Sequence, residues 1–133
     1  MWHHELLAAL DAGVAVFGGA SMGALRAAEL ERFGMVGVGQ VFRWVRDGVV
    51  VDDSEVALLH AGPEHGHRPL TLPLVNVRHA GRCARAAGAL GAKEERELIA
   101  AASEIFYQQR HWPGVLAAAS KHWRRSTLAR WRA

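Results

Sequence analysis

The sequence is short of several features that would place a protein in a membrane or outside the cell. Its 133 residues include a single cysteine, Cys83, so no internal disulfide can form and a reducing cytosol is the expected compartment. The chain has no run of about 18 apolar residues, and its N-terminus lacks the basic start of a secretory signal. We therefore expect a cytoplasmic protein that does not enter a membrane.

Length and composition limit the class further. Half of the residues are hydrophobic and 22% are charged, which excludes a disordered chain, a collagen-like repeat and a coiled-coil rod. A chain of 133 residues is the size of one average domain, so we expect a single domain over 1–133.

Charge is divided unevenly along the chain. Residues 1–66 hold four basic and nine acidic side chains, whereas residues 67–133 hold twelve basic and four acidic ones. A basic half suits nucleic acid or an acidic protein partner. Aromatic and basic residues also alternate near the C-terminus, which suits the same partners or an amphipathic helix with its tryptophans inside. These residues are Trp112, Trp123, Trp131, Arg110, Arg124, Arg125, Arg130 and Arg132.

The spacing of apolar residues predicts an α/β fold. We expect a small, mostly parallel sheet with flanking helices in the N-terminal half, and a helical C-terminal half. The apolar run Val14–Phe17 should be a buried strand that ends in a glycine-rich turn. The expected strands are 14–17, 49–51 and 56–59, and the expected helices are 3–11, 22–33, 40–47, 71–90, 93–107 and 113–123.

The turn after the first expected strand has the pattern of a nucleophile elbow. Gly19-Ala20-Ser21-Met22-Gly23 matches Gly-x-Ser-x-Gly, between an expected strand and an expected helix. Small residues on both sides permit a strained turn that exposes the Ser21 hydroxyl, and the helix N-terminus offers backbone N–H groups to an oxyanion. Two other interpretations stay open: Ser21 as a helix cap, or the turn as a phosphate site.

A nucleophilic serine needs a base, and the residues alone do not select one. The chain has eight histidines, and His60 with Asp52 or Asp53 would complete a Ser-His-Asp set. Lysine is scarce, with only Lys93 and Lys121. No cysteine or histidine spacing typical of a zinc site is present, so we expect no metal and no cofactor.

Several ordered stretches of the chain resemble the TfuA-like family. The first runs from Phe17 to Leu30 and contains the serine motif, and the second runs from Phe33 to Phe42. Further matching stretches are Asp52–Ala57 with His60, Arg68–Leu70, Leu74–Arg78, and Phe106–Tyr107 with Arg110 and Trp112–Pro113. The resemblance covers nearly the whole chain and is more specific than the serine motif alone.

This resemblance implies a role beside a YcaO-type enzyme, which uses ATP to activate a peptide backbone amide so that sulfur can replace its oxygen. TfuA-like proteins assist such thioamide formation in ribosomal peptide natural products and in a methanogen enzyme. The family is associated with hydrolysing a thiocarboxylated, ThiS-like sulfur-carrier protein, which releases sulfide, and with binding the YcaO partner. The resemblance therefore implies a serine hydrolase-like enzyme that acts on a thiocarboxylate.

The resemblance also implies roles for individual residues. The family's hydrolase-like site is a Ser–Lys pair whose serine falls on Ser21. Its lysine lies in a Trp-His-Lys-Glu stretch on the first helix, where this chain has His4 at the lysine position. We expect Ser21 to attack the thiocarboxylate and His4 to accept its proton. The turn residues Gly19, Met22 and Gly23 should hold the oxyanion, and His3, Arg26, Glu29, Glu55 and His60 should line the site or contact a partner, with Arg26 and Glu29 spaced to pair on one helix face.

Two other functions stay open. The chain could be a non-catalytic accessory that docks on the YcaO enzyme and activates it, or a nucleic-acid-binding module that uses its basic half. Of these partners, we expect the basic half to dock proteins rather than nucleic acid. Family members usually carry an α/β stretch before this core, so we expect 1–133 to expose a sheet edge or strand face near Val14–Phe17. A partner, or a second copy in a homodimer, would cover that face.

Overall fold

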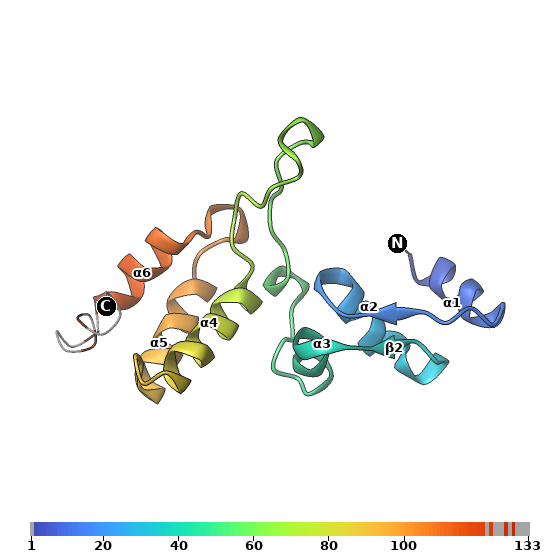
Figure 1. Cartoon of the computed structure of the whole chain (residues 1–133), viewed down its shortest axis with the longest axis horizontal. Helices are drawn as coiled ribbons and strands as arrows, with labels where there is room; N and C mark the ends of the chain where they lie inside the picture. The colour runs from blue at the N-terminus through green and yellow to red at the C-terminus, as the bar shows by residue number, and fades with distance from the viewer. Residues whose placement is uncertain (1, 122, 124–126, 128, 130–133) are drawn as a thin grey trace. The chain divides into compact units, whose positions relative to one another are not determined.

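A computed structural model describes residues 2–121, 123, 127 and 129 (Figure 1). The chain forms two compact units, Met1–Asp53 and Ser54–Ala133. The expectation of a single domain over 1–133 stays a prediction.

The first unit is a small α/β structure built around a parallel pair of strands. Strands β1 (Phe17–Gly18) and β2 (Val36–Gly37) pair with Phe17 opposite Val36 and Gly18 opposite Gly37. The α-helices of the unit are α1 (His3–Asp11), α2 (Ser21–Leu30) and α3 (Gly39–Arg46), and a 3-10 turn, η1 (Glu31–Phe33), follows α2. Parallel strands require a crossover, and α2 supplies it between β1 and β2.

The helices of this unit pack on one face of the strand pair. A Cβ at Gly18 would collide with the Gly23 carbonyl and approach the Ala27 Cβ to 2.9 Å, and a Cβ at Gly37 would collide with the Phe42 ring. Glycine at both positions therefore lets α2 and α3 approach the strands closely. The buried core on this face comprises Leu6, Ala24, Ala27, Leu30, Met35 and Phe42.

The opposite face of the strand pair carries exposed apolar side chains. Successive strand residues point to opposite faces, so Phe17 and Val36 face away from the helices, and their exposed fractions are 63% and 44%. Val14 and Val38 are also exposed, at 54% and 46%. The exposed face agrees with the expectation of an uncovered strand face, but the expected buried strand over 14–17 is wrong. Strand β1 is only Phe17–Gly18, and both Val14 and Phe17 are exposed.

The second unit is helical, as expected of the C-terminal half. Its α-helices within the described residues are α4 (Leu74–Ala86), α5 (Ala92–Ser103) and α6 (Trp112–Ser120), and α5 packs against both others. Their core comprises Leu72, Leu74, Val77, Leu90, Leu98, Ala102, Val115, Ala119 and Trp123, with Trp112 packed against it. Trp112 and Trp123 thus contact the core as the amphipathic-helix interpretation expects. Helix α6 ends at Ser120, before the expected 123, so Trp123 lies beyond the helix. The remaining residues of the aromatic and basic stretch, Arg124, Arg125, Arg130, Trp131 and Arg132, lie outside the described residues.

The other two expected strands are also wrong. The backbone N–H groups of Val49 and Val50 both donate to the Trp44 carbonyl, at 2.8 and 3.0 Å, so residues 49–51 close the end of α3. Residues 56–59 follow a 3-10 turn, η2 (Asp53–Glu55), and pair with no strand. The sheet of the described residues therefore has two strands.

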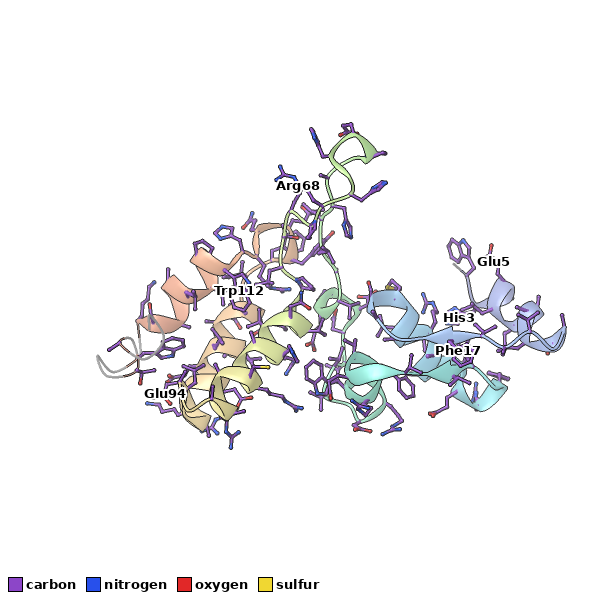
Figure 2. The ribbon with its side chains drawn as sticks, viewed as in Figure 1. His3, Glu5, Phe17, Arg68, Glu94 and Trp112 are labelled. Atoms are coloured by element: carbon purple, nitrogen blue, oxygen red, sulfur yellow. The ribbon has the colours of Figure 1, made fainter. Side chains whose placement is uncertain are left out.

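The chain between η2 and α4 forms an arm held by a few backbone hydrogen bonds. Leu70 N–H donates to the Leu59 carbonyl at 2.8 Å, and Ala61 N–H donates to the Arg68 carbonyl at 2.9 Å. Residues 63–70 are exposed throughout and include a 3-10 turn, η3 (Pro63–His65), and Arg68 is labelled on the arm in Figure 2.

Arg110 is buried in the second unit and hydrogen-bonds to main-chain carbonyls of three residues. It is 3% exposed, and its guanidinium donates to the carbonyls of Ala102, Ile105 and Leu72 at 2.9, 3.0 and 3.4 Å. Burial lowers the pKa of Arg110, and the charge of Glu55 opposes that shift. The Ala102 carbonyl also accepts the Ile105 N–H at 3.3 Å, so Arg110 adds a donor where α5 ends. Helix α5 stops at Ser103, before the expected 107.

No helix among the described residues has both the length and the apolar character needed to cross a membrane.

Candidate functional site

The turn between β1 and α2 carries an unusual backbone conformation at Ser21. Its φ angle is +48°, in the left-handed region that non-glycine residues rarely adopt. Such a conformation costs roughly 1–3 kcal/mol and persists only where the surrounding structure imposes it. Here the short connection Gly19–Ala20 leads directly from β1 into α2 at Ser21.

Close packing around the turn imposes that conformation. Gly18 lies against the Gly23 carbonyl, and a Cβ at Gly19 would come within 2.9 Å of the Val38 side chain. Larger residues at these positions would push α2 away from the strands. The small residues of the motif are therefore explained by the close approach of strand and helix.

The Ser21 hydroxyl is free. The residue is exposed, and within the described part of the chain its side chain makes no hydrogen bond. The N-cap residue of α2 is Ala20, and no side chain caps the helix. The interpretation of Ser21 as a capping side chain therefore has no hydrogen bond to support it.

The first turn of α2, which begins at Ser21, has backbone N–H groups without an acceptor in the helix. The first hydrogen bond within α2 runs from Ala24 N–H to the Ala20 carbonyl, at 3.2 Å. The N–H groups of Met22 and Gly23 precede it in the helix and have no intrahelical acceptor. Together with the positive end of the helix dipole, they form a place where an oxyanion would be stabilised.

A network of three side chains, those of His3, Arg26 and Glu29, joins α1 to α2. The His3 Nε2 lies 2.7 Å from the Glu29 carboxylate, and the Arg26 guanidinium donates to the same carboxylate at 2.6 Å. Arg26 and Glu29 thus pair as their spacing predicts. Partial burial acts to raise the pKa of Glu29, but the hydrogen bonds and charges of Arg26 and His3 outweigh it and hold that pKa below its ordinary value. His3, Arg26 and Glu29 are therefore together in the first unit.

His4 lies on the exposed side of α1. Among the described residues its imidazole makes no hydrogen bond, and none joins it to Ser21. His3 is the histidine of α1 whose side chain reaches α2. Catalytic hydrogen bonds often form only when substrate binds, so the role of His4 stays a prediction.

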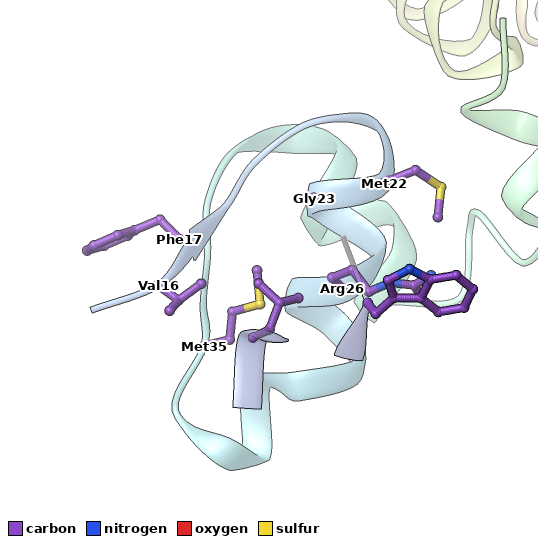
Figure 3. A pocket seen from close by; sticks show the side chains of 8 residues that line it. Val16, Phe17, Met22, Gly23, Arg26 and Met35 are labelled. Atoms are coloured by element: carbon purple, nitrogen blue, oxygen red, sulfur yellow. The ribbon is translucent and has the colours of Figure 1, made fainter. Parts of the chain in front are cut away.

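A pocket of about 530 Å³ lies beside the turn (Figure 3). Its walls are mostly apolar, with one cation, and comprise Trp2, Leu6, Val16, Phe17, Met22, Gly23, Arg26 and Met35. The Phe17 ring points away from the other lining side chains, in agreement with its exposure. The Arg26 Nε is buried without a hydrogen-bond acceptor. The sequence did not single out Trp2, Leu6, Val16, Phe17 and Met35 for this site, because no local pattern connects three separate segments.

Glu55 and His60 belong to the second unit. Glu55 is 6% exposed, and its carboxylate accepts a hydrogen bond from Arg78 at 2.7 Å. The His60 Nδ1 lies 2.9 Å from the His67 carbonyl within the arm. These contacts are structural, and a place for either residue at the Ser21 site stays a prediction.

A strand, a tight turn with a strained serine and a helix N-terminus beside an apolar pocket together define an α/β protein with a Gly-x-Ser-x-Gly turn between strand and helix. The model of the family described as TfuA-like protein matches residues 1–111 of the 133-residue chain, so the chain belongs to the TfuA-like family. Membership assigns it a role in a YcaO-associated thioamidation system. A search of curated proteins gives no match.

Proposed function

We propose that the protein is a hydrolase of this system, which releases sulfide from a thiocarboxylated, ThiS-like carrier protein with Ser21 as its nucleophile. The observation that carries the proposal is the conformation of Ser21: a free hydroxyl on a left-handed residue at the start of α2. A serine that only began a helix would need neither the strained φ nor the glycine packing around it.

The reaction follows from the groups at the turn. The Ser21 Oγ attacks the thiocarboxylate carbon, and its proton passes to His4. The N–H groups of Met22 and Gly23 donate to the oxyanion of the tetrahedral intermediate. His4 returns the proton to the sulfur, the carbon–sulfur bond breaks and hydrosulfide leaves, so the carrier is held as an ester of Ser21. Water hydrolyses that ester and returns the free hydroxyl and a carrier that ends in a carboxylate.

His3 is a second candidate for the base. Its imidazole is oriented toward α2 by Glu29, the arrangement in which a carboxylate positions a catalytic histidine. His4 is proposed first because it takes the family's lysine position. Separate substitutions of the two residues distinguish them.

The arm of the second unit supports a further role in partner binding. Leu59 and Leu70 face each other across the arm, where the Leu70 N–H donates to the Leu59 carbonyl. Their side chains are 36% and 51% exposed. Apolar side chains on an exposed arm suit a protein interface. We propose that this arm contacts the YcaO enzyme, and this role does not require Ser21 to be catalytic.

The decisive experiment incubates the protein with thiocarboxylated carrier and follows the carrier mass. Wild type should replace sulfur by oxygen, and Ser21→Ala should lose about 10³-fold or more in rate. Ser103→Ala is the matched control, because this exposed hydroxyl donates to the Ala100 carbonyl of its own helix and lies in the second unit, away from the Ser21 turn in sequence. Hydrolysis by Ser21→Ala at the wild-type rate would exclude a catalytic serine and leave the accessory role.

A further inference from the structure

The outer edge of β1 carries unused main-chain groups. Val36 N–H donates to the Val16 carbonyl and Val38 N–H to the Gly18 carbonyl, both at 2.9 Å. Residues 16 and 18 therefore direct their polar groups toward β2, and alternation along the strand directs those of Phe17 to the opposite edge. Within the described residues, neither the N–H nor the carbonyl of Phe17 has a hydrogen-bond partner.

The pocket of about 530 Å³ borders β1. Val16 and Phe17 line it (Figure 3), whereas neither residue of β2 does. Leu6 of α1 and Trp2, the residue before α1, also line it. A strand placed beside β1 would direct every second side chain to the face that holds the helices. The pocket offers apolar volume for such side chains.

The carboxyl end of β1 offers groups that suit an anion. Three residues beyond Gly18 the chain reaches Ser21, followed by the unused N–H groups of Met22 and Gly23. The Arg26 Nε, buried in the pocket wall, has no acceptor. A strand added parallel to β1 would bring its own carboxyl end to this place, because parallel strands end at the same edge of a sheet.

We infer that the C-terminal tail of the carrier protein binds in extended form as a strand parallel to β1. Its main chain pairs with the N–H and carbonyl of Phe17, its apolar side chains enter the pocket, and its terminal group lies at Ser21. This inference rests on the proposed function for the identity of the carrier. A free C-terminal tail fits better than an internal segment because the anion-binding groups lie where an added parallel strand ends.

The test measures backbone amide exchange in the Ser21→Ala protein while carrier in its unreactive carboxylate form is added. The Phe17 amide should exchange at least about tenfold more slowly when carrier is bound, since it gains an acceptor. Carrier that lacks its C-terminal tail is the matched control and should give no protection. Binding of intact carrier without slower exchange at Phe17 would overturn strand addition. Protection that rises with protein concentration alone would assign the edge to a second copy and also overturn the inference.

A second experiment uses substitutions of Phe17. Phe17→Pro removes the edge N–H where proline is tolerated, and Phe17→Leu keeps it. Carrier affinity should fall about tenfold more in Phe17→Pro than in Phe17→Leu. Equal affinities in two folded variants would contradict the inference, and if Phe17→Pro does not fold, the exchange measurement decides alone.

Failure of this inference is distinguishable from failure of the proposed function. Slower exchange at Phe17 with no hydrolysis by wild type would retain strand addition and remove the hydrolase activity. Hydrolysis without slower exchange would retain the activity and remove strand addition.

Discussion

The His3 imidazole and the Glu29 carboxylate lie 2.7 Å apart, so a contact between residues 26 positions apart in sequence joins α1 to α2. Arg26 donates to the same carboxylate at 2.6 Å, and it also lines the pocket beside Ser21. The network therefore fixes one wall of the candidate site as well as the position of the first helix.

The lowered pKa of Glu29 gives the network a pH dependence. The folded protein keeps this carboxylate charged to lower pH than the unfolded chain does, so its stabilisation is present above the ordinary value of 4.5 and is lost as pH falls through the lowered value. The side chain is 47% exposed, so we expect about 0.2–1 kcal/mol. Urea unfolding of wild type and Glu29→Gln should differ at pH 6 but converge near pH 2. Glu31→Gln is the control, and a difference that persists in acid would contradict the assignment.

The approach of β1 to α2 can be tested with two glycines. Gly18→Ala should lower the free energy of unfolding by about 1–3 kcal/mol, because its Cβ would collide with the Gly23 carbonyl. Gly23→Ala is the matched control: its Cβ would lie 3.8 Å from the Gly18 Cα, an ordinary contact inside a helix. Denaturant unfolding measures both, and equal effects would show that the packing does not require glycine at 18.

The strained conformation of Ser21 predicts an order of stability among its variants. Glycine accepts a φ of +48° without a steric cost, whereas alanine does not. Ser21→Gly should therefore be about 1 kcal/mol more stable than Ser21→Ala. Thermal unfolding of the two variants is the measurement, and neither has the hydroxyl. Equal melting temperatures would indicate that the turn is not strained.

A lysine at position 4 tests the proposed base. His4→Lys restores the family's residue, and an ammonium releases its proton at higher pH than an imidazolium does. The pH–rate profile of carrier hydrolysis should therefore shift toward alkaline pH in this variant. His3→Lys is the comparison. A shift seen only with His3→Lys would move the role of base to His3.

Arg110 provides a prediction for the second unit. Arg110→Ala should cost about 2–3 kcal/mol, because it removes the buried guanidinium that donates to the Ala102 and Ile105 carbonyls of the second unit. Arg96→Ala removes an exposed arginine of the same helix and should change stability by less than about 0.5 kcal/mol. Denaturant unfolding compares the two, and similar losses would contradict a structural role for Arg110.

Local signals in the sequence predicted much of the first unit. The spacing of Leu6, Leu7 and Leu10 gave the first helix with its observed bounds, and the Gly19–Gly23 motif located the turn. The expected strand at 49–51 is wrong. A run of β-branched residues has strand propensity, but the N–H groups of Val49 and Val50 donate to the Trp44 carbonyl instead of to a neighbouring strand. Tertiary contacts decided that outcome.

The candidate site was harder to predict as a whole. Ser21 and the Arg26–Glu29 pair follow from local spacing, but the pocket is assembled from Trp2, Val16 and Met35, which no periodicity connects. The contact of His3 with Glu29 depends on how α1 packs, and a single sequence does not contain that information.

The shortness of the strand pair has a consequence for how long a ligand stays. Strand β1 extends over two residues, so an added strand can form few main-chain hydrogen bonds along it. Few bonds mean fast dissociation, and differences in affinity between related complexes arise mainly in the off-rate. A carrier that has lost its sulfur would then leave quickly enough for the next one to enter. The same short edge is a poor template for the continuous stacking that builds fibres, although its outer face is apolar.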